Sequence, residues 1–184
     1  AALALCYASS NSTFADLVVD VNDGETLSVR KLDEAIKVKI DGHLDEPFWQ
    51  TLPAYDEFLV TTPETLGKVP HATLVRLAYS EAGFYVGIDL KQSKETLIQR
   101  LSGRDRRDIT RDSISFTLDT SGQGRYGYWF SVSLGDSLQD GTVLPERKFT
   151  SDWDGAWYGS SQETDTGWSA EFFVPWGTVS MPAD

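Results

Sequence analysis

Cysteine, histidine and methionine are scarce in this chain of 184 residues, which has one cysteine, two histidines and one methionine. A single cysteine, Cys6, can form neither an intrachain disulfide nor a cysteine-based zinc site. The histidines, His43 and His71, belong to no His-Glu-x-x-His motif, and no Gly-x-Ser-x-Gly sequence is present. Zinc-dependent and serine-type catalysis therefore find no support in the sequence.

Long apolar runs and an excess of basic residues are also missing. No stretch after residue 15 reaches the roughly 18 apolar residues that a membrane helix needs. Lysine and arginine number 16 against 28 acidic residues, which gives a formal charge of −12. Nucleic acid and anionic membranes would be repelled, so neither is expected as a partner. A neutral or cationic ligand, or a divalent metal ion, fits this charge better.

The chain begins with a small apolar stretch at residues 1–8, which is typical of the end of a secretory signal peptide. Residues 13–15 offer a small-residue cleavage site ahead of Asp16. Lipidation of Cys6 is the alternative, but the bulky Leu5 before it favours cleavage. We therefore expect a secreted, periplasmic or outer-membrane-associated protein.

These features divide the chain into three parts. We expect residues 1–15 to be a signal-peptide remnant, residues 16–35 a polar leader, and residues 36–184 one folded domain that is truncated at its C-terminus. The composition, with 40% hydrophobic and 12% aromatic residues, is ordinary for a globular protein. The length suffices for a single substantial core.

Short segments of alternating apolar and polar residues run through this domain, and a period of two is typical of half-buried strands. The predicted strands cover residues 36–40, 71–79, 84–90, 112–119, 126–134, 153–160 and 168–174, with helical turns in 45–49 and 91–101 and a polar turn at 135–141. This pattern predicts an all-β fold, an antiparallel β-sandwich of the immunoglobulin or jelly-roll kind with one or two short helical turns.

Tryptophans suggest a binding face. Trp153 and Trp157 alternate with Asp152 and Asp154, so on a strand both indoles project from one side. Such a platform suits sugars, because the C–H face of a pyranose packs on indole while its hydroxyls need polar partners. The alternative is that both indoles close the edge of a core. Trp129 is expected on the outer face of its strand, either covered by a loop or open to a ligand.

Five arginines are concentrated between residues 100 and 112, where they alternate with aspartates. One interpretation is a self-neutralising loop whose surface ion pairs contribute about 0–1 kcal/mol each. The other is that guanidinium groups grip ligand hydroxyls near the tryptophans. Arg107 and Arg111, followed by Asp112, are the candidates because they lie nearest the next strand.

Carboxylates in the predicted loops could serve a metal ion or catalysis. Calcium needs six to eight oxygen ligands, and the candidates are Asp119, Asp136, Asp140, Asp152 and Asp154. Solvated surface acids are the alternative for any one of them. A carboxylate pair for glycoside hydrolysis is also conceivable, but the sequence shows no arranged pair. No organic cofactor is expected.

Several pieces of the chain, taken in order, resemble the family 9 carbohydrate-binding modules. They resemble more closely the relatives of these modules at the N-terminus of large bacterial outer-membrane β-barrel proteins of unassigned function. The matching pieces are the Asp-Gly-His-Leu-Asp-Glu-Pro-Phe-Trp sequence of residues 41–49, then 75–88, 111–119, 126–134, 152–157 and 167–175.

The resemblance implies a β-sandwich that binds saccharides, in some members with structural calcium, and clamps the sugar between tryptophans. Trp157 is the best match to a clamping aromatic, whereas Trp49 looks like core. The resulting hypothesis is a non-catalytic carbohydrate-binding module whose partner is a saccharide and whose chain continues into a barrel. The alternatives are a structural domain of such a barrel protein and, less favoured, a glycoside hydrolase.

Overall fold

The computed structural model describes residues 2–7, 17–21, 25–61, 64–106 and 109–181, and the side chains of residues 29–60, 65–106, 109–146 and 148–181. Within these residues lie thirteen strands and four short 3-10 turns. The strands are β1 (Ala2–Tyr7), β2 (Leu17–Val21), β3 (Glu25–Lys31), β4 (Leu59–Thr61), β5 (Glu64–Lys68), β6 (Thr73–Tyr79), β7 (Gly83–Lys91), β8 (Ser113–Asp119), β9 (Gly127–Ser133), β10 (Ser137–Leu144), β11 (Lys148–Thr150), β12 (Tyr158–Thr164) and β13 (Gly167–Pro175). The 3-10 turns are η1 (Pro47–Thr51), η2 (Lys94–Thr96), η3 (Pro145–Arg147) and η4 (Trp176–Thr178).

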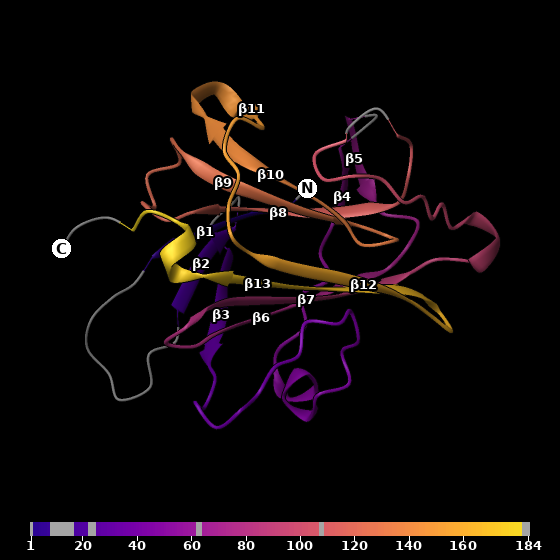
Figure 1. The fold of residues 1–184 in the computed structure, drawn as a ribbon, viewed down its shortest axis with the longest axis horizontal. Coiled ribbons are helices and arrows are strands. Elements are labelled where there is room, and N and C mark those ends of the chain that lie inside the picture. Colours follow the sequence, from indigo (N-terminus) through magenta and orange to yellow (C-terminus); the bar gives the residue numbers. More distant parts are fainter. Residues whose placement is uncertain (1, 8–16, 22–24, 62–63, 107–108, 182–184) are drawn as a thin grey trace.

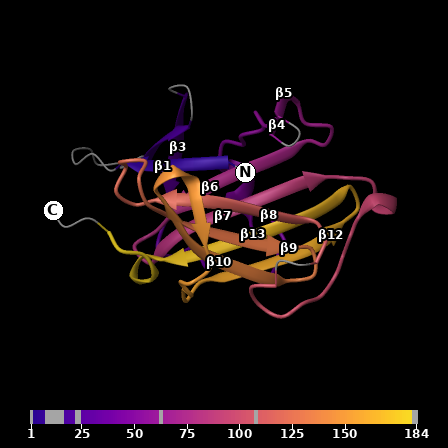
Figure 2. The same cartoon turned by 90° about the horizontal axis from the view of Figure 1, so that it is seen from above.

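The strands form two facing layers, which confirms the predicted β-sandwich (Figure 1). One layer contains β8, β9, β10 and β11, and the other contains β6, β7, β13 and β12. β1, β2 and β3 connect the two layers along one side, so these eleven strands form one continuous curled sheet, while β4 and β5 pair in a separate two-stranded sheet (Figure 2). Neighbours are antiparallel except for the pairs β1–β8 and β3–β6. Among the described residues, no helix has the length and apolar character to cross a membrane.

Inward-facing aromatic residues of both layers meet in the main core. Phe116 of β8 packs on Phe130 of β9 with ring centroids 5.2 Å apart, and it meets Phe172 of β13 edge-on at the same distance. Burial of rings of this size is the main favourable contribution to folding. The alternation predicted over residues 112–119 and 126–134 is therefore confirmed, with these aromatic residues inside and polar residues of both strands on the opposite face.

A second, smaller core lies on the outer face of the β7–β13 layer. There η1 buries Phe48 and Trp49 against Leu52 and Ala78, which confirms the helical turn predicted over residues 45–49. Gly87 of β7 makes this approach possible, because a Cβ at that position would lie 2.9 Å from the Trp49 ring.

The carboxylate of Glu171 on β13 joins this outer layer to the sandwich. Its Oε1 accepts a hydrogen bond from Trp49 Nε1 at 3.0 Å, and its Oε2 accepts from the backbone amides of Asp41 and Gly42 at 3.0 and 2.9 Å. Glu171 is 0% exposed, and burial raises its pKa to about 7, against the opposing effect of these three donors. The backbone amides of Asp41 and Gly42 and the indole N–H of Trp49 thus all donate to one buried carboxylate.

Gly42 is required at this junction for two reasons. Its φ of 87° lies in the left-handed region that favours glycine, and a Cβ there would lie 2.6 Å from the backbone carbon of Ser161. Its carbonyl accepts a hydrogen bond of 2.6 Å from Ser169 Oγ on β13.

Three of the sequence-based expectations were wrong in detail. Residues 36–40 form no strand, because the amide of Lys39 is bound to the Glu46 side chain instead of to a neighbouring strand. The expected polar turn at 135–141 is a turn followed by β10, whose residues pair with β9. Residues 153–157 are irregular, and strand β12 begins only at Tyr158.

The hairpin predicted over residues 71–90 is confirmed as β6 and β7. In the N-terminal region, β1, β2 and β3 pair within the sheet where a signal remnant and a polar leader were expected. Cleavage near residue 15 stays a prediction.

We predict that Glu171→Gln destabilises the protein by about 2–3 kcal/mol at pH 5. Both oxygens of Glu171 can accept hydrogen bonds even when the group is protonated, as its pKa of about 7 implies at this pH, whereas the amide nitrogen of glutamine cannot, so either Trp49 Nε1 or the 41–42 amides lose their acceptor. Urea unfolding measures the free energy of unfolding. The matched control is Glu163→Gln on exposed β12, for which a change within about 0.5 kcal/mol is expected. Equal effects of the two variants would contradict the role assigned to Glu171.

We also predict that Glu171 makes stability fall as the pH rises from about 4.5 to 7. Because its folded pKa of about 7 exceeds the ordinary value of 4.5, the folded state binds more protons than the unfolded state in this window. The contribution is complete below the lower value and is lost by the upper one, a change of roughly 3 kcal/mol. The difference in unfolding free energy between wild type and Glu171→Gln should therefore shrink from pH 5 to pH 8, whereas a constant difference would refute the assignment.

Candidate functional site

Trp157, the first candidate for a sugar platform, lies in the core. Its indole is 5% exposed, stacks on Phe172 with centroids 5.8 Å apart, and meets Phe130 edge-on at 5.3 Å. Packing against other aromatic rings thus leaves the indole almost no surface for a ligand. The platform prediction assumed a strand over residues 153–160, and it fails because the chain there crosses between the layers instead.

The other two tryptophans are also packed against protein. The half-buried Trp153 lies against Tyr128 with centroids 4.7 Å apart and edge-on to Phe130 at 6.0 Å. Trp129 is on the outer face of β9, as predicted, and is covered there: its Nε1 donates to the carbonyl of Thr150 on β11 at 2.9 Å. Of the two alternatives given for each residue, the packing one is observed.

Arg104 holds residues 151–157, the segment that crosses between the layers, in place. Its Nη2 donates to Asp140 Oδ1 at 2.7 Å and to the carbonyl of Gly155 at 3.0 Å, and it lies 2.9 Å from Asp154 Oδ1. The guanidinium carbon lies 5.9 Å from the centroid of the Trp157 ring, a cation–π contact. Sequence reasoning selected other arginines because proximity to the next strand was its only guide.

Asp140 completes this group from β10. Its carboxylate is 1% exposed, and its Oδ2 accepts the backbone N–H of Gly155 at 2.7 Å. Burial raises the pKa of Asp140, while the Gly155 amide and Arg104 oppose that rise. Arg104 and Asp140 therefore act together as an internal clamp on the crossing segment, and the Asp154 carboxylate is the member that faces solvent.

Arg111 and Asp112 lie at the start of β8 and hold a loop. Arg111 donates to Ser102 Oγ and to the carbonyl of Arg106, and Asp112 Oδ2 accepts from Gln92 Nε2 at 3.1 Å and from the amide of Ile98 at 2.8 Å. These contacts go to hydroxyl, carbonyl and amide groups, whereas Arg104 and Asp105 form an arginine–aspartate pair of the predicted self-neutralising kind, with Nε and Oδ2 3.8 Å apart. Arg107 lies outside the described residues.

The five aspartates named for calcium do not gather in one place. Asp119 Oδ1 accepts the amides of Ser121 and Gly122, Asp136 Oδ1 accepts Ser160 Oγ and the Ser161 amide, and Asp152 accepts Thr150 Oγ1. Asp140 and Asp154 share Arg104. In the part of the chain that the structure describes, no group of three or more His, Cys, Asp or Glu side chains is placed to hold a metal ion. Calcium binding stays a prediction.

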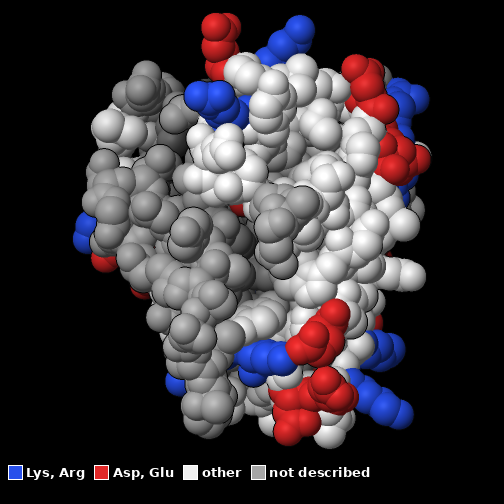
Figure 3. Space-filling model, turned by 90° about the vertical axis from the view of Figure 1, so that its left-hand side faces the viewer, with Lys and Arg blue, Asp and Glu red and all other residues white. Residues whose placement is uncertain are grey.

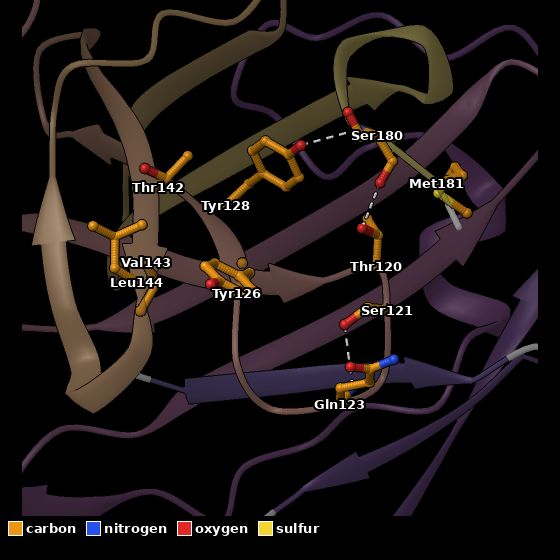
Figure 4. Close-up of a pocket in the computed structure, with 11 residues that line it drawn as sticks. Thr120, Ser121, Gln123, Tyr126, Tyr128, Thr142, Val143, Leu144, Ser180 and Met181 are labelled. Atoms are coloured by element: carbon orange, nitrogen blue, oxygen red, sulfur yellow. Dashed lines mark hydrogen bonds between the residues drawn. The ribbon is translucent and has the colours of Figure 1, made fainter. Parts of the chain in front are cut away.

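The structure reveals a pocket that sequence reasoning missed. It has a volume of about 460 Å³ and lies between the β8–β9 turn, β10 and residues 180–181. Figure 4 shows Tyr126, Tyr128, Thr120, Ser121 and Ser180 around it. Figure 3 views this end of the sandwich, where the charged side chains of the described residues are seen mostly along the top, the right edge and the bottom. The glycine-flanked Tyr126 and Tyr128 were the available signal, but both were counted as strand residues.

We predict that Arg104→Ala loosens the crossing segment and lowers the free energy of unfolding by about 2–4 kcal/mol. The variant leaves the buried Asp140 carboxylate without its counter-charge. Hydrogen exchange at the Gly155 amide should become faster, and urea unfolding gives the stability. Arg100→Ala, at an exposed position of the same loop, is the control and should change stability by less than about 0.5 kcal/mol. Unchanged exchange in Arg104→Ala would rule out the clamp.

Comparison with known proteins shows which solved structures have a similar fold. No protein-family model and no curated protein matches the sequence. Among solved structures, the chain is similar to a family 9 carbohydrate-binding module from Caldicellulosiruptor kristjanssonii in complex with glucose, with a TM-score of 0.53, 12% identity, and coverage of 84% of this chain and 71% of that one. A module of this family from the same organism in complex with cellotriose gives a TM-score of 0.51 and 12% identity, over 79% of this chain and 65% of that one. The protein thus has a fold like that of the family 9 carbohydrate-binding modules.

Proposed function

We propose that this protein is a non-catalytic carbohydrate-binding module of a secreted or cell-envelope protein. The observation that carries the proposal is the shared fold with two modules whose structures contain glucose and cellotriose. At 12% identity this likeness concerns the fold, so the binding function has to be supported by the residues of this chain.

The charge and surface of the protein agree with a neutral ligand. The net charge of −12 disfavours polyanions, and one end of the sandwich has a pocket lined by tyrosines, hydroxyls and an amide. Ligand sites commonly combine aromatic walls with a few polar groups in this way. Sugars need both, because a pyranose has apolar C–H faces and a rim of hydroxyls.

Catalysis is not part of the proposal. A glycosidase needs two carboxyl groups that face the scissile bond across a cleft, one of them with a raised pKa. Glu171 has the raised pKa, but it is covered by residues 41–49 and its oxygens are bound to three donors. Asp140, the other buried carboxylate with a raised pKa, is bound to Arg104 and Gly155.

The cellular setting belongs to the proposal and rests on the sequence. A signal-like N-terminus favours a secreted, periplasmic or outer-membrane-associated location, and the resemblance to barrel-linked relatives favours a barrel domain further along the same chain. A structural role beside such a barrel is the second candidate. It differs in predicting no affinity for free saccharides.

We predict that isothermal titration with cellotriose or glucose gives a saturable heat. A dissociation constant between about 1 mM and 1 μM corresponds to −4 to −8 kcal/mol, a range open to a ligand with few heavy atoms. Sorbitol is the control, because it has the hydroxyls of a sugar without the pyranose ring and should give no saturable heat. Absence of binding across a panel of neutral and acidic saccharides would favour the structural alternative.

A further inference from the structure

We propose that the pocket between the β8–β9 turn, β10 and Ser180 is a saccharide site that takes a neutral pyranose unit. This inference rests on the proposed function and names its location. The pocket lies at the opposite end of β8 from Arg111 and Asp112, two of the candidates named from the sequence. None of the three tryptophans named from the sequence lines it.

Two tyrosine rings supply the aromatic part of the site. Tyr126 is 61% exposed at the pocket, which is unusual for so large a ring. Tyr128 follows two residues later and lines the same space, and its ring is backed by Trp153 at a centroid distance of 4.7 Å. A pyranose can therefore stack on the exposed phenol ring while its edge meets a ring that packing holds in place.

Uncharged polar groups share the rest of the lining with the apolar side chains of Val143, Leu144 and Met181. Thr120, Ser121 and Ser180 carry hydroxyls and Gln123 carries an amide, and Figure 4 shows them along one side of the pocket, across from Thr142. Thr120 Oγ1 and Ser121 Oγ already donate to Ser180 and Asp119 and offer a sugar their lone pairs, whereas the hydroxyl of Ser180 and the amide of Gln123 can both donate and accept. The lining residues thus match both kinds of surface that a pyranose presents.

The polar side of the pocket is fixed before any ligand binds. The buried Asp119 accepts the amides of Ser121, Gly122 and Gly124, at 2.8, 3.1 and 2.6 Å, and so holds the β8–β9 turn in one conformation. Such preorganisation lowers the entropic cost of binding.

The segment after β13 helps to fix this same side of the pocket. Thr120 Oγ1 donates to the carbonyl of Ser180 at 2.6 Å, and the Ser180 amide donates to Tyr128 Oη at 3.1 Å. Tyr128 keeps its own hydroxyl hydrogen for a further acceptor, because it is the acceptor in that bond. Ser180 therefore links Thr120 of the β8–β9 turn to the ring of Tyr128 on β9 and fixes how far apart they lie.

Charge and size indicate the class of ligand. No lysine, arginine, aspartate or glutamate is among the described residues that line the pocket, although 44 of the 184 residues (16 basic plus 28 acidic) are charged. A uronic acid or a sugar phosphate would find no counter-charge there, whereas a neutral pyranose needs none. The volume of about 460 Å³ falls within the range of small-ligand sites.

The test is calorimetric titration of wild type, Tyr126→Ala and Tyr158→Ala with cellotriose. Tyr158 is the matched control, because it is 60% exposed on β12 and does not line the pocket. We expect Tyr126→Ala to weaken binding about tenfold or more, and Tyr126→Phe and Tyr158→Ala to stay within about threefold of wild type. Equal thermal midpoints of the variants show that each is folded.

Mapping of backbone amide shifts during the same titration locates the ligand independently. Shifts at residues 120–127 and 142–144 support the site. Wild-type binding that Tyr126→Ala leaves intact, or shifts confined to residues 152–157, would overturn this site and leave the proposed function standing. A wild-type protein that binds none of the saccharides would overturn both.

Discussion

The buried carboxylate of Glu171 is the interaction on which the arrangement of the two cores depends. It is fully covered, yet it accepts three hydrogen bonds from residues about 120–130 positions earlier in the chain. A buried carboxylate without partners would be very costly, so residues 41–49 have to dock wherever β13 runs. The left-handed turn at Gly42 and the short 3-10 turn that contains Trp49 bring their N–H groups to this acceptor.

Arg104 and Asp140 play the corresponding part on the other side of the sandwich. Together they fasten the segment that carries the chain from the β8–β11 layer to the β12–β13 layer, and that segment places Trp153 and Trp157. Trp157 then fills the core, and Trp153 backs the ring of Tyr128. The tryptophans of the crossing segment therefore pack inside the protein, and Tyr128, which Trp153 supports, lines the pocket instead.

The sequence was sufficient for the elements that alternate cleanly. β8 and β9, with Phe116 and Phe130 inside, follow directly from a period of two. Residues 36–40 also alternate, but they form no strand because Lys39 is bound to a side chain within its own loop. Alternation therefore indicates a strand only where a neighbouring strand is available, and that depends on tertiary structure.

The candidate site was harder to predict for a physical reason. Whether an aromatic ring is buried or exposed depends on what crosses above it, and the sequence around Trp157 does not record that Arg104 and Phe172 cover it. Tyr126 follows the turn in which the Asp119 carboxylate accepts the amides of Ser121 and Gly124. Its exposure depends on the path of the backbone through that turn, which the sequence does not specify. Aspartates that seemed suited to calcium proved to be bound to backbone amides.

The central claim is that this sandwich binds a neutral sugar at the end where the β8–β9 turn meets residue 180. A crystal structure of the protein grown with cellotriose tests it most directly. The account predicts a pyranose ring stacked on Tyr126 with hydroxyls bound to the turn. A sugar found elsewhere on the protein would contradict the location, and crystals without bound sugar at a saturating concentration would contradict the function.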